Sequence, residues 1–375
     1  MRLDIRRKKL PDMFVFRDGT RVHTKEDWFR RREEILEEVI NLEFDGMPPK
    51  PEVFEVSPAS RPLGKMGVTY RVQCGTKEKT FSFSFVAHLP QKGEGKKYPV
   101  VVTGDSMYYH NCTPEVIDEA HKRGFAVVRF SREEMAPDLA DPDRKYGINS
   151  LWPELDFSTI SAWAWGYHRV VDALMTLNWV DTDHIAITGH SRGGKTVLLA
   201  GATDTRIRYV NPNGSGTHGC GSYYFYQLEN FGNGEYHSED LGFMFENMPY
   251  WMGKGLREYI GREEEIPYDT HYIKALIAPR CYLETNGYSD IWANPRGAYL
   301  TWLAAREAWK LYGEQNRTCV WYREGGHGHK MPDFTALFDF MEANLYNKPY
   351  AEEFTRVPYE EGMEPLHDWS CPEIN

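Results

Sequence analysis

Residues 184–202 constrain the fold of this chain more than any other stretch of its sequence. They read HIAITGHSRGGKTVLLAGA: a β-branched run suited to a buried strand, a G-x-S-x-G turn, and a helical segment rich in Leu and Ala. A serine at the apex of such a strand–turn–helix unit is exposed for nucleophilic attack. A chance serine in a strand-to-helix turn is the alternative, but both flanking patterns favour Ser191 as a nucleophile.

Strand and helix patterns alternate along most of the chain. Residues 53–89 alternate between apolar and polar side chains, as antiparallel strands do. After them, short apolar runs typical of buried strands are separated by segments with helical periodicity. The predicted strands are 98–103, 125–130, 185–188, 281–285 and 318–322, with another from 209 into a glycine-dense loop, and the predicted helices are 114–123, 158–180, 195–201, 296–312 and 333–345. This order predicts a three-layer α/β/α sandwich with a mostly parallel central sheet.

The chain shows no internal repeat and no linker, so we expect a single domain over residues 1–375. Residues 1–50 are its helical lead-in, in which a capping box at Thr24 and Asp27 opens a helix. Residues 222–272 depart from the alternation and are rich in Tyr, Phe, Trp, Asn and Glu. We interpret them as an insertion over the edge of the sheet that carries the serine.

Composition argues against several classes of partner. The net charge of −11 leaves no basic excess for binding nucleic acid or an anionic membrane surface. No stretch is long and apolar enough to span a bilayer, and residues 1–16 lack the apolar core of a signal peptide. Six scattered cysteines without a C-x-x-C pattern are typical of reduced thiols, so we expect a cytoplasmic protein. Secretion is the alternative if a signal peptide has been removed. Nothing in the sequence indicates the oligomeric state.

A serine nucleophile needs a base to take its proton and an acid to orient that base. In sheets of this class the acid and the histidine follow the serine in that order, each on a loop after a later strand. Asp290 comes after the strand 281–285, and His327 comes after the strand 318–322. The sequence therefore predicts a catalytic triad of Ser191, His327 and Asp290 in an α/β-hydrolase fold.

Several alternatives to this triad stay open at the level of sequence. His329 is the second candidate for the base, and Glu284 and Glu229 compete with Asp290 as the acid. Asp290 taken alone could equally cap the helix that follows it. A metal site at His327 and His329 lacks a third ligand of matching spacing, so we expect neither metal nor cofactor. Whether a second carboxylate assists the histidine is also open.

Two cations lie just after the serine. The backbone N–H of Arg192 is a donor that the turn supplies to a developing oxyanion, and its guanidinium can add a charged donor. The alternative is a simple surface arginine. Lys195, one helical turn further on, is expected to point toward the mouth of the turn. In a chain of net charge −11, two such cations indicate a substrate with an anionic or strongly polar group.

Four motifs resemble the glucuronoyl esterases of carbohydrate esterase family 15. They are HSRGGK at 190–195, AWAWG at 162–166, ALIAPR at 275–280 and WANPRG at 292–297. The N-terminal helix, from Trp28 to the GMPP sequence at 46–49, resembles that family and its acetyl-xylan-esterase-like relatives as well. The resemblance covers most of the chain and implies hydrolysis of the ester between a glucuronic acid and a lignin alcohol.

The resemblance also implies roles for individual residues. Ser191 would attack the ester, Arg192 would help to hold the oxyanion, and Lys195 would contact sugar hydroxyls. His327 matches the family's histidine, and Asp290 matches the acid of its bacterial members.

A sugar site is implied too, and its tryptophan and glutamate are matched to Trp251 and Glu246 in the insertion. The partner would be a small carbohydrate ester, because a cytoplasmic member would act on imported uronate esters rather than on a polymer outside the cell. The alternatives are an acetyl-xylan or other sugar acetyl esterase, and an inactive carbohydrate-binding homologue.

Overall fold

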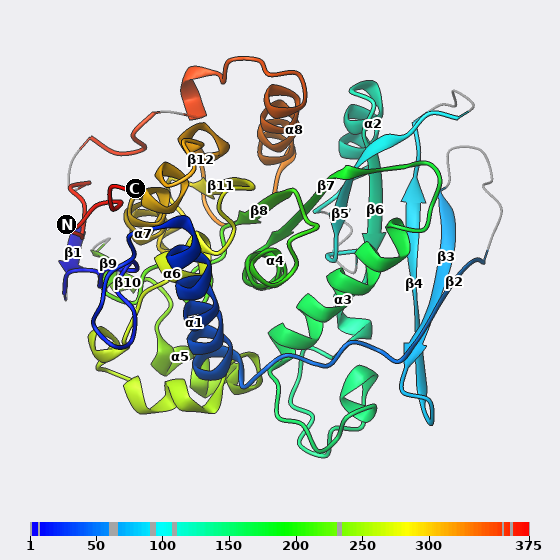
Figure 1. The fold of residues 1–375 in the computed structure, drawn as a ribbon, viewed down its shortest axis with the longest axis horizontal. Coiled ribbons are helices and arrows are strands. Elements are labelled where there is room, and N and C mark those ends of the chain that lie inside the picture. The colour runs from blue at the N-terminus through cyan, green and yellow to red at the C-terminus, as the bar shows by residue number, and fades with distance from the viewer. Residues whose placement is uncertain are drawn as a thin grey trace.

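A large sheet runs through the centre of the protein. The computed structural model describes residues 2–6, 8–59, 67–90, 95–106, 111–230, 235–354, 356–360 and 363–374. Within these ranges, nine strands form one sheet in the order β12-β11-β8-β7-β5-β6-β4-β3-β2 (Figure 1). Their bounds are β2 Val53–Pro58, β3 Val68–Gly75, β4 Thr80–His88, β5 Tyr98–Thr103, β6 Ala126–Phe130, β7 Val180–His190, β8 Tyr209–Asn213, β11 Cys281–Gly287 and β12 Thr318–Arg323.

Strand directions follow the sequence patterns. Neighbouring strands from β12 to β6 are parallel, whereas β6, β4, β3 and β2 pair antiparallel. The mostly parallel sheet predicted from the alternating pattern is therefore confirmed, with the antiparallel strands in the segment where period-2 alternation predicted them.

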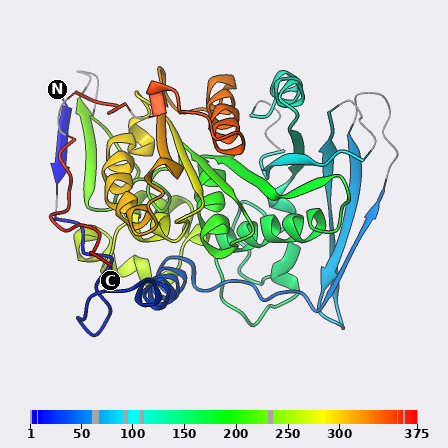
Figure 2. The same ribbon diagram turned by 45° about the horizontal axis from the view of Figure 1, so that its top comes forward.

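Helices cover both faces of the sheet (Figures 1 and 2). Their bounds are α1 Lys25–Phe44, α2 Pro114–Lys122, α3 Thr159–Leu174, α4 Arg192–Thr203, α5 Leu241–Asn247, α6 His271–Ala275, α7 Pro295–Lys310 and α8 Met331–Leu345. Successive side chains of β5 point to opposite faces of the sheet. Val100 and Val102 pack on one face with α3, α4 and α7, and Val101 packs on the other face with α2 and α8. The three-layer α/β/α architecture is confirmed.

One boundary differs clearly from its prediction. The helix expected over 158–180 ends at Leu174, and β7 begins at Val180 rather than near 185. Trp179 and Val180 fit the helical spacing of apolar residues, but their backbones pair with β5 instead. The carbonyl of Trp179 accepts the N–H of Tyr98 at 2.8 Å, and Val180 pairs with Tyr98. Pairing with β5 therefore overrides the local helical pattern.

The N-terminal lead-in packs against the insertion. The capping box of α1 is present: Thr24 Oγ1 accepts the N–H of Asp27 at 3.0 Å, and Asp27 accepts the N–H of Thr24 at 3.1 Å. Ahead of this helix, β1 (Arg2–Arg6) pairs antiparallel with β9 (Phe225–Asn230), which also pairs with β10 (Glu235–His237). Part of the predicted insertion is thus a second, small sheet completed by the chain's N-terminus.

Two further features bear on the sequence predictions. None of the described helices is long and apolar enough to cross a membrane. All six cysteines lie in the described residues and are unpaired, with only Cys371 partly exposed. The single-domain organisation and the cytoplasmic location stay predictions.

Candidate active site

The turn between β7 and α4 holds Ser191 in a strained backbone conformation. Its φ and ψ are 55° and −119°, outside the regions that non-glycine residues favour. Gly189 and Gly193 make this turn possible, because a Cβ on Gly189 would lie 2.5 Å from the carbonyl oxygen of Gly193. The predicted strand–turn–helix setting of Ser191 is confirmed.

A buried carboxylate behind the turn keeps it in place. Asp105, which is 2% exposed, accepts the backbone N–H of His190 at 2.8 Å and forms an ion pair with the fully buried Arg132. A Cβ on Gly193 would collide with the same carboxylate. The backbone N–H of Ser191 donates to the carbonyl of Asn213 at 2.9 Å. Asp105 could not be identified from the sequence, because its partners His190 and Arg132 lie far from it along the chain.

The predicted base and acid are in contact. His327 Nδ1 lies 2.8 Å from Asp290 Oδ2, and the Asp290 side chain is 2% exposed while that of His327 is 36% exposed. A proton on Nδ1 directed at the carboxylate leaves Nε2 to accept a proton from a nucleophile. The ring of His327 lies 4.4 Å, centroid to centroid, from that of His190, the residue before Ser191. The loops after β11 and β12 therefore bring both groups to the strained turn.

Asp290 contacts His327, and it caps a short helix that differs from the helix at Pro295 suggested by the sequence. Its Oδ1 accepts the N–H of Ala293 at 3.3 Å and caps a short 3₁₀ helix, Ile291–Ala293, while Oδ2 faces His327. The following helix α7 has its own cap, Asn294, which accepts the N–H of Gly297. The cap fixes the carboxylate and so favours its orienting role.

His329 is placed differently from His327. It is 3% exposed, and its ring stacks on Phe334 at 4.0 Å with an interplanar angle of 14°. Within the described residues, neither ring nitrogen has a hydrogen-bond partner. Burial, together with the nearby His190 and Arg323, holds the pKa of His329 well below its usual value. A neutral, enclosed ring without a carboxylate partner does not suit the base, so the geometry favours His327.

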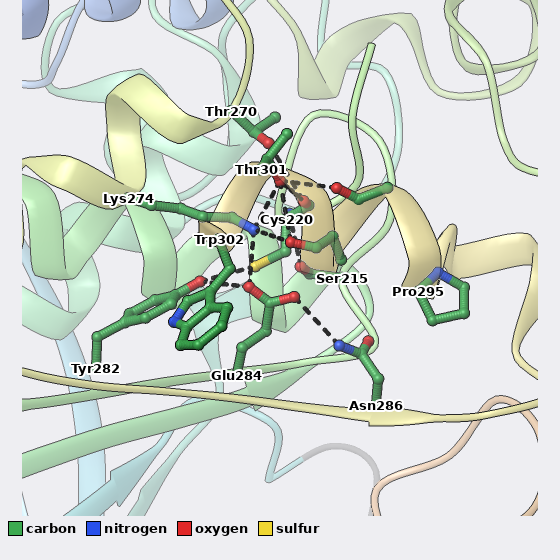
Figure 3. Close-up of polar contacts among 12 residues, drawn as sticks. Ser215, Cys220, Thr270, Lys274, Tyr282, Glu284, Asn286, Pro295, Thr301 and Trp302 are labelled. Carbon is green, nitrogen blue, oxygen red and sulfur yellow. Dashed lines mark hydrogen bonds and ion pairs between the residues drawn. The ribbon is translucent and has the colours of Figure 1, made fainter. Parts of the chain in front are cut away.

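The competing acid Glu284 is committed elsewhere. It lies inside β11, fully buried, and pairs with Lys274 at 2.8 Å (Figure 3). Its carboxylate also accepts the hydroxyl of Tyr282 at 2.8 Å and the amide of Asn286 at 3.2 Å. The other competitor, Glu229, belongs to β9 of the small sheet. The prediction that names Asp290 is the one that the contacts support.

The loop after β8 supports the base without supplying a second acid. Asn213 donates to Thr285 Oγ1 at 2.9 Å and accepts from His190 Nδ1 at 2.7 Å, which fixes the ring beside His327. Burial and the neighbouring His327 lower the pKa of His190 to about 3, so this ring is neutral. Gly214, at φ 49°, lies against Asp290, where a Cβ would be 3.1 Å from Oδ2.

Lys195 does not point toward the mouth of the turn as expected. It is 1% exposed, and its ammonium donates to the carbonyls of Ser215 and Thr217 and to Glu239 Oε1. These three acceptors use all three of its protons. The Lys195–Glu239 ion pair, at 2.7 Å, is buried, and burial lowers the pKa of the lysine and raises that of the glutamate. In this conformation Lys195 therefore has no proton left for a sugar hydroxyl, and its contact with sugar hydroxyls stays a prediction.

Arg192 is held against the insertion. Its guanidinium forms an ion pair with Asp138 and lies over the ring of Trp251, with Cζ 4.7 Å from the ring centroid. Trp251 Nε1 donates to Asp138 Oδ1 at 2.8 Å, and the hydroxyl of Tyr250 donates to the Asp138 backbone oxygen at 3.0 Å. The Arg192 side chain is 36% exposed, so it is not the simple surface arginine of the alternative interpretation.

Two predicted sugar-binding residues have other positions. Trp251 is 2% exposed and lies behind Arg192, so it supports the arginine rather than offering a free ring to a sugar. Glu246 is exposed on α5, and no hydrogen bond or ion pair among the described residues joins it to the site. The positions of Trp251 and Glu246 therefore do not support the sugar-binding roles that the family resemblance implied for them.

The two cations led us to expect a substrate with an anionic or strongly polar group, and their ion pairs argue against the anionic form. Arg192 is paired with Asp138 and Lys195 with Glu239, so the four charges cancel. Neither carboxylate stood out in the sequence, because each lies dozens of residues from its partner. In the described part of the chain, no group of three or more His, Cys, Asp or Glu side chains is arranged to hold a metal ion.

Comparison with known proteins gives a consistent result. The family model for fungal glucuronyl esterases matches residues 72–313. The 4-O-methyl-glucuronoyl methylesterase of Cerrena unicolor is 30% identical over 329 residues, which cover 86% of this chain and 65% of that protein. The chain thus spans about two thirds of the length of that relative.

Solved structures resemble the fold over nearly its whole length. A carbohydrate esterase family 15 glucuronoyl esterase from Caldicellulosiruptor kristjansonii is 29% identical, with a TM-score of 0.81 over 97% of both chains. The glucuronoyl esterase catalytic domain from Hypocrea jecorina is 24% identical, with a TM-score of 0.78 over 99% of this chain and 98% of that one. The second likeness concerns the fold alone.

Proposed function

This chain belongs to the glucuronoyl esterases of carbohydrate esterase family 15, and we propose that it hydrolyses esters of glucuronic acid with Ser191 as the nucleophile. The observation that carries this proposal is the contact of 2.8 Å between His327 and Asp290 beside the strained serine. A serine, a histidine and a carboxylate in this arrangement perform acyl transfer.

In the proposed first half-reaction, Ser191 Oγ attacks the ester carbonyl carbon and its proton passes to His327 Nε2. Asp290 stabilises the imidazolium through Nδ1. Backbone N–H groups at the start of α4 and the guanidinium of Arg192 stabilise the negative charge on the carbonyl oxygen. The tetrahedral intermediate then expels the alcohol, which takes the proton from His327 and leaves a glucuronoyl ester on Ser191.

In the second half-reaction, a water molecule gives a proton to His327 and attacks the acyl carbon. Collapse of this intermediate returns the proton to Ser191 Oγ and releases the uronic acid, which ionises to the carboxylate at neutral pH. In both half-reactions the proton moves only between His327 and Ser191, the alcohol or the water, while Asp290 and the oxyanion donors keep their own protonation states.

A uronate ester suits the charges of the site. Its carboxyl group is uncharged while it is esterified, and the ion-paired Arg192 and Lys195 present no net charge to it. The relative from Cerrena unicolor, which carries the name 4-O-methyl-glucuronoyl methylesterase, supports the same substrate class. The alcohol half of the substrate is left open.

The test compares two substrates side by side. Benzyl glucuronate should be hydrolysed, and Ser191→Ala should abolish the reaction. An acetylated xylo-oligosaccharide should be a poor substrate. Turnover of the acetate alone would overturn the glucuronate assignment in favour of a sugar acetyl esterase, and binding of either compound without turnover would favour an inactive carbohydrate-binding homologue.

We further propose that the enzyme acts in the cytoplasm on small, soluble uronate esters. The support for this is the six cysteines, which are scattered along the chain and unpaired. Cell fractionation followed by immunodetection tests it, and recovery of the protein only outside the cells would contradict it.

A further inference from the structure

We propose that Asp138 determines specificity at this site: it neutralises Arg192, so that the enzyme takes the uncharged ester and readily releases the anionic acid. This inference rests on the proposed function and concerns the charge of the same site. It assigns a role to a residue of the long loop between β6 and α3.

The contacts of Asp138 bring several donors to one carboxylate. It forms the ion pair with Arg192, and its Oδ1 lies 2.8 Å from Trp251 Nε1 and 3.4 Å from the hydroxyl of Tyr250. The Asp138 side chain is only 10% exposed, whereas that of Arg192 is 36% exposed. Asp138 is therefore the more enclosed member of the pair, and Arg192 is the member that solvent reaches more easily.

The second cation near the serine is compensated in the same way. Lys195 is paired with Glu239 at 2.7 Å, with side chains 1% and 6% exposed. Lys195 is enclosed by its three acceptors, so Arg192 is the cation of this pair that a ligand beside Ser191 can reach. The affinity of the site for an anion therefore depends on the net charge of the Arg192–Asp138 pair, and Asp138 sets that charge.

Hydrolysis changes the charge of the carboxyl group that Ser191 attacks, and Arg192 is the next residue along the chain. The ester carboxyl is neutral before the reaction, and the product carries a full negative charge on the same group. An uncompensated guanidinium would form a strong, charge-assisted hydrogen bond with that product. With Asp138 in place, the guanidinium can still donate to a transient oxyanion, but its net attraction for the free carboxylate is small.

A merely structural role for Asp138 makes the opposite prediction. If the carboxylate only held the loop and Trp251 in place, its loss would weaken the binding of substrate and product alike. If it neutralises Arg192, its loss strengthens the binding of the carboxylate product. The sign of the change in product affinity therefore separates the two roles.

The experiment uses Asp138→Asn, which keeps the shape and an oxygen acceptor for Trp251 Nε1. The inhibition constant of glucuronate is measured against benzyl glucuronate hydrolysis in wild type, Asp138→Asn and a control, Asp156→Asn. Asp156 lies in the same loop and is 64% exposed, in an ion pair with Lys254. We expect glucuronate to bind roughly five- to tenfold more tightly to Asp138→Asn, and unchanged to Asp156→Asn.

The salt dependence of glucuronate inhibition is a second test, and it can be measured on the wild-type enzyme as well as on the variant. The gain in glucuronate affinity of Asp138→Asn should disappear between about 20 mM and about 500 mM salt, because salt screens an exposed charge. In wild type the inhibition constant should change less than about twofold over that range. Strong salt dependence in wild type, or unchanged or weaker glucuronate binding by folded Asp138→Asn, would overturn the proposal.

A parallel arm separates this inference from the proposed function. Hydrolysis of 4-nitrophenyl acetate with acetate ion as the inhibitor needs the serine and Arg192 but no sugar. If benzyl glucuronate is not hydrolysed, the substrate assignment fails, and tighter acetate inhibition of Asp138→Asn still supports the role of Asp138. If acetate inhibition is unchanged in that variant, the role of Asp138 fails whatever the substrate.

Discussion

Glu284, in the middle of β11, and Asp290, three residues beyond the end of that strand, have different partners and different roles. Both carboxylates are buried, so burial does not separate them. Glu284 faces the interior, where Lys274, Tyr282 and Asn286 satisfy it (Figure 3). Asp290 is past the end of β11, where it meets a histidine whose other edge is exposed.

The difference between the two lies in their partners. A lysine ammonium keeps its proton across the neutral range, so Glu284 contributes to a fixed charge pair that stabilises the fold. A histidine gains and loses its proton near neutrality, so Asp290 acts on a group that can transfer protons. The partner of a buried carboxylate, rather than the extent of its burial, distinguishes an orienting acid from a structural one.

The largest effect is expected for Asp290→Asn. The amide cannot stabilise an imidazolium at His327, so kcat should fall about a thousand- to ten-thousand-fold, as seen when the acid of a triad is replaced. Steady-state kinetics on benzyl glucuronate measure this. The melting temperature should change little, since asparagine can still accept the N–H of Ala293. Retention of more than a tenth of the activity would mean that another carboxylate orients the base.

Glu284→Gln should lower the stability of the protein and leave its activity almost unchanged. It leaves Lys274 buried without a counter-charge, so the free energy of unfolding should fall by about 3–5 kcal/mol. The folded fraction should keep kcat within about threefold. Urea unfolding followed by circular dichroism measures the loss. Adding Lys274→Met should recover part of the stability, because the unpaired charge is then removed as well; an equal loss in the double variant would argue against the charge as its cause.

Glu43 extends the comparison to a buried carboxylate that has no cation. It is 1% exposed beside the hydroxyls of Tyr223 and Tyr268, and burial raises its pKa from 4.5 to about 8. His218, 3.8 Å away, has its own pKa lowered to about 3 by burial and supplies no charge. Glu43 is therefore protonated in the folded protein at neutral pH.

The sign of the resulting pH dependence follows from linkage. Between about 4.5 and about 8 the folded state binds a proton at Glu43 that the unfolded state has lost, so stability falls as the pH rises through this window. We expect wild type to lose roughly 3–4 kcal/mol more than Glu43→Gln between pH 5 and pH 8.5. Urea unfolding of both proteins at a series of pH values measures it, and parallel pH profiles would contradict the assignment.

Much of the site could be predicted from order along the chain. Serine, acid and histidine each follow their own strand, and parallel strands bring those loops to one edge of the sheet. The resemblance to carbohydrate esterase family 15 is confirmed, as is the α/β architecture. These features depend on local patterns and on topology, which a sequence expresses directly.

The environment of the cations could not be predicted in this way. Arg192 and Asp138 are 54 residues apart, and Lys195 and Glu239 are 44 apart, so no local spacing indicates either pair. Trp251 lies behind Arg192, and its burial there depends on how the insertion folds. Side-chain pairing across distant loops is a property of the packed structure.

Reaction with a fluorophosphonate probe tests the central claim most directly. The probe should form one adduct, located on Ser191 by peptide mass spectrometry. His327→Ala should slow labelling by about a hundredfold or more, since the serine then has no general base. The matched variant His329→Ala should label at nearly the wild-type rate. Failure of the folded protein to label at Ser191, or loss of labelling with His329→Ala rather than His327→Ala, would contradict the proposed triad.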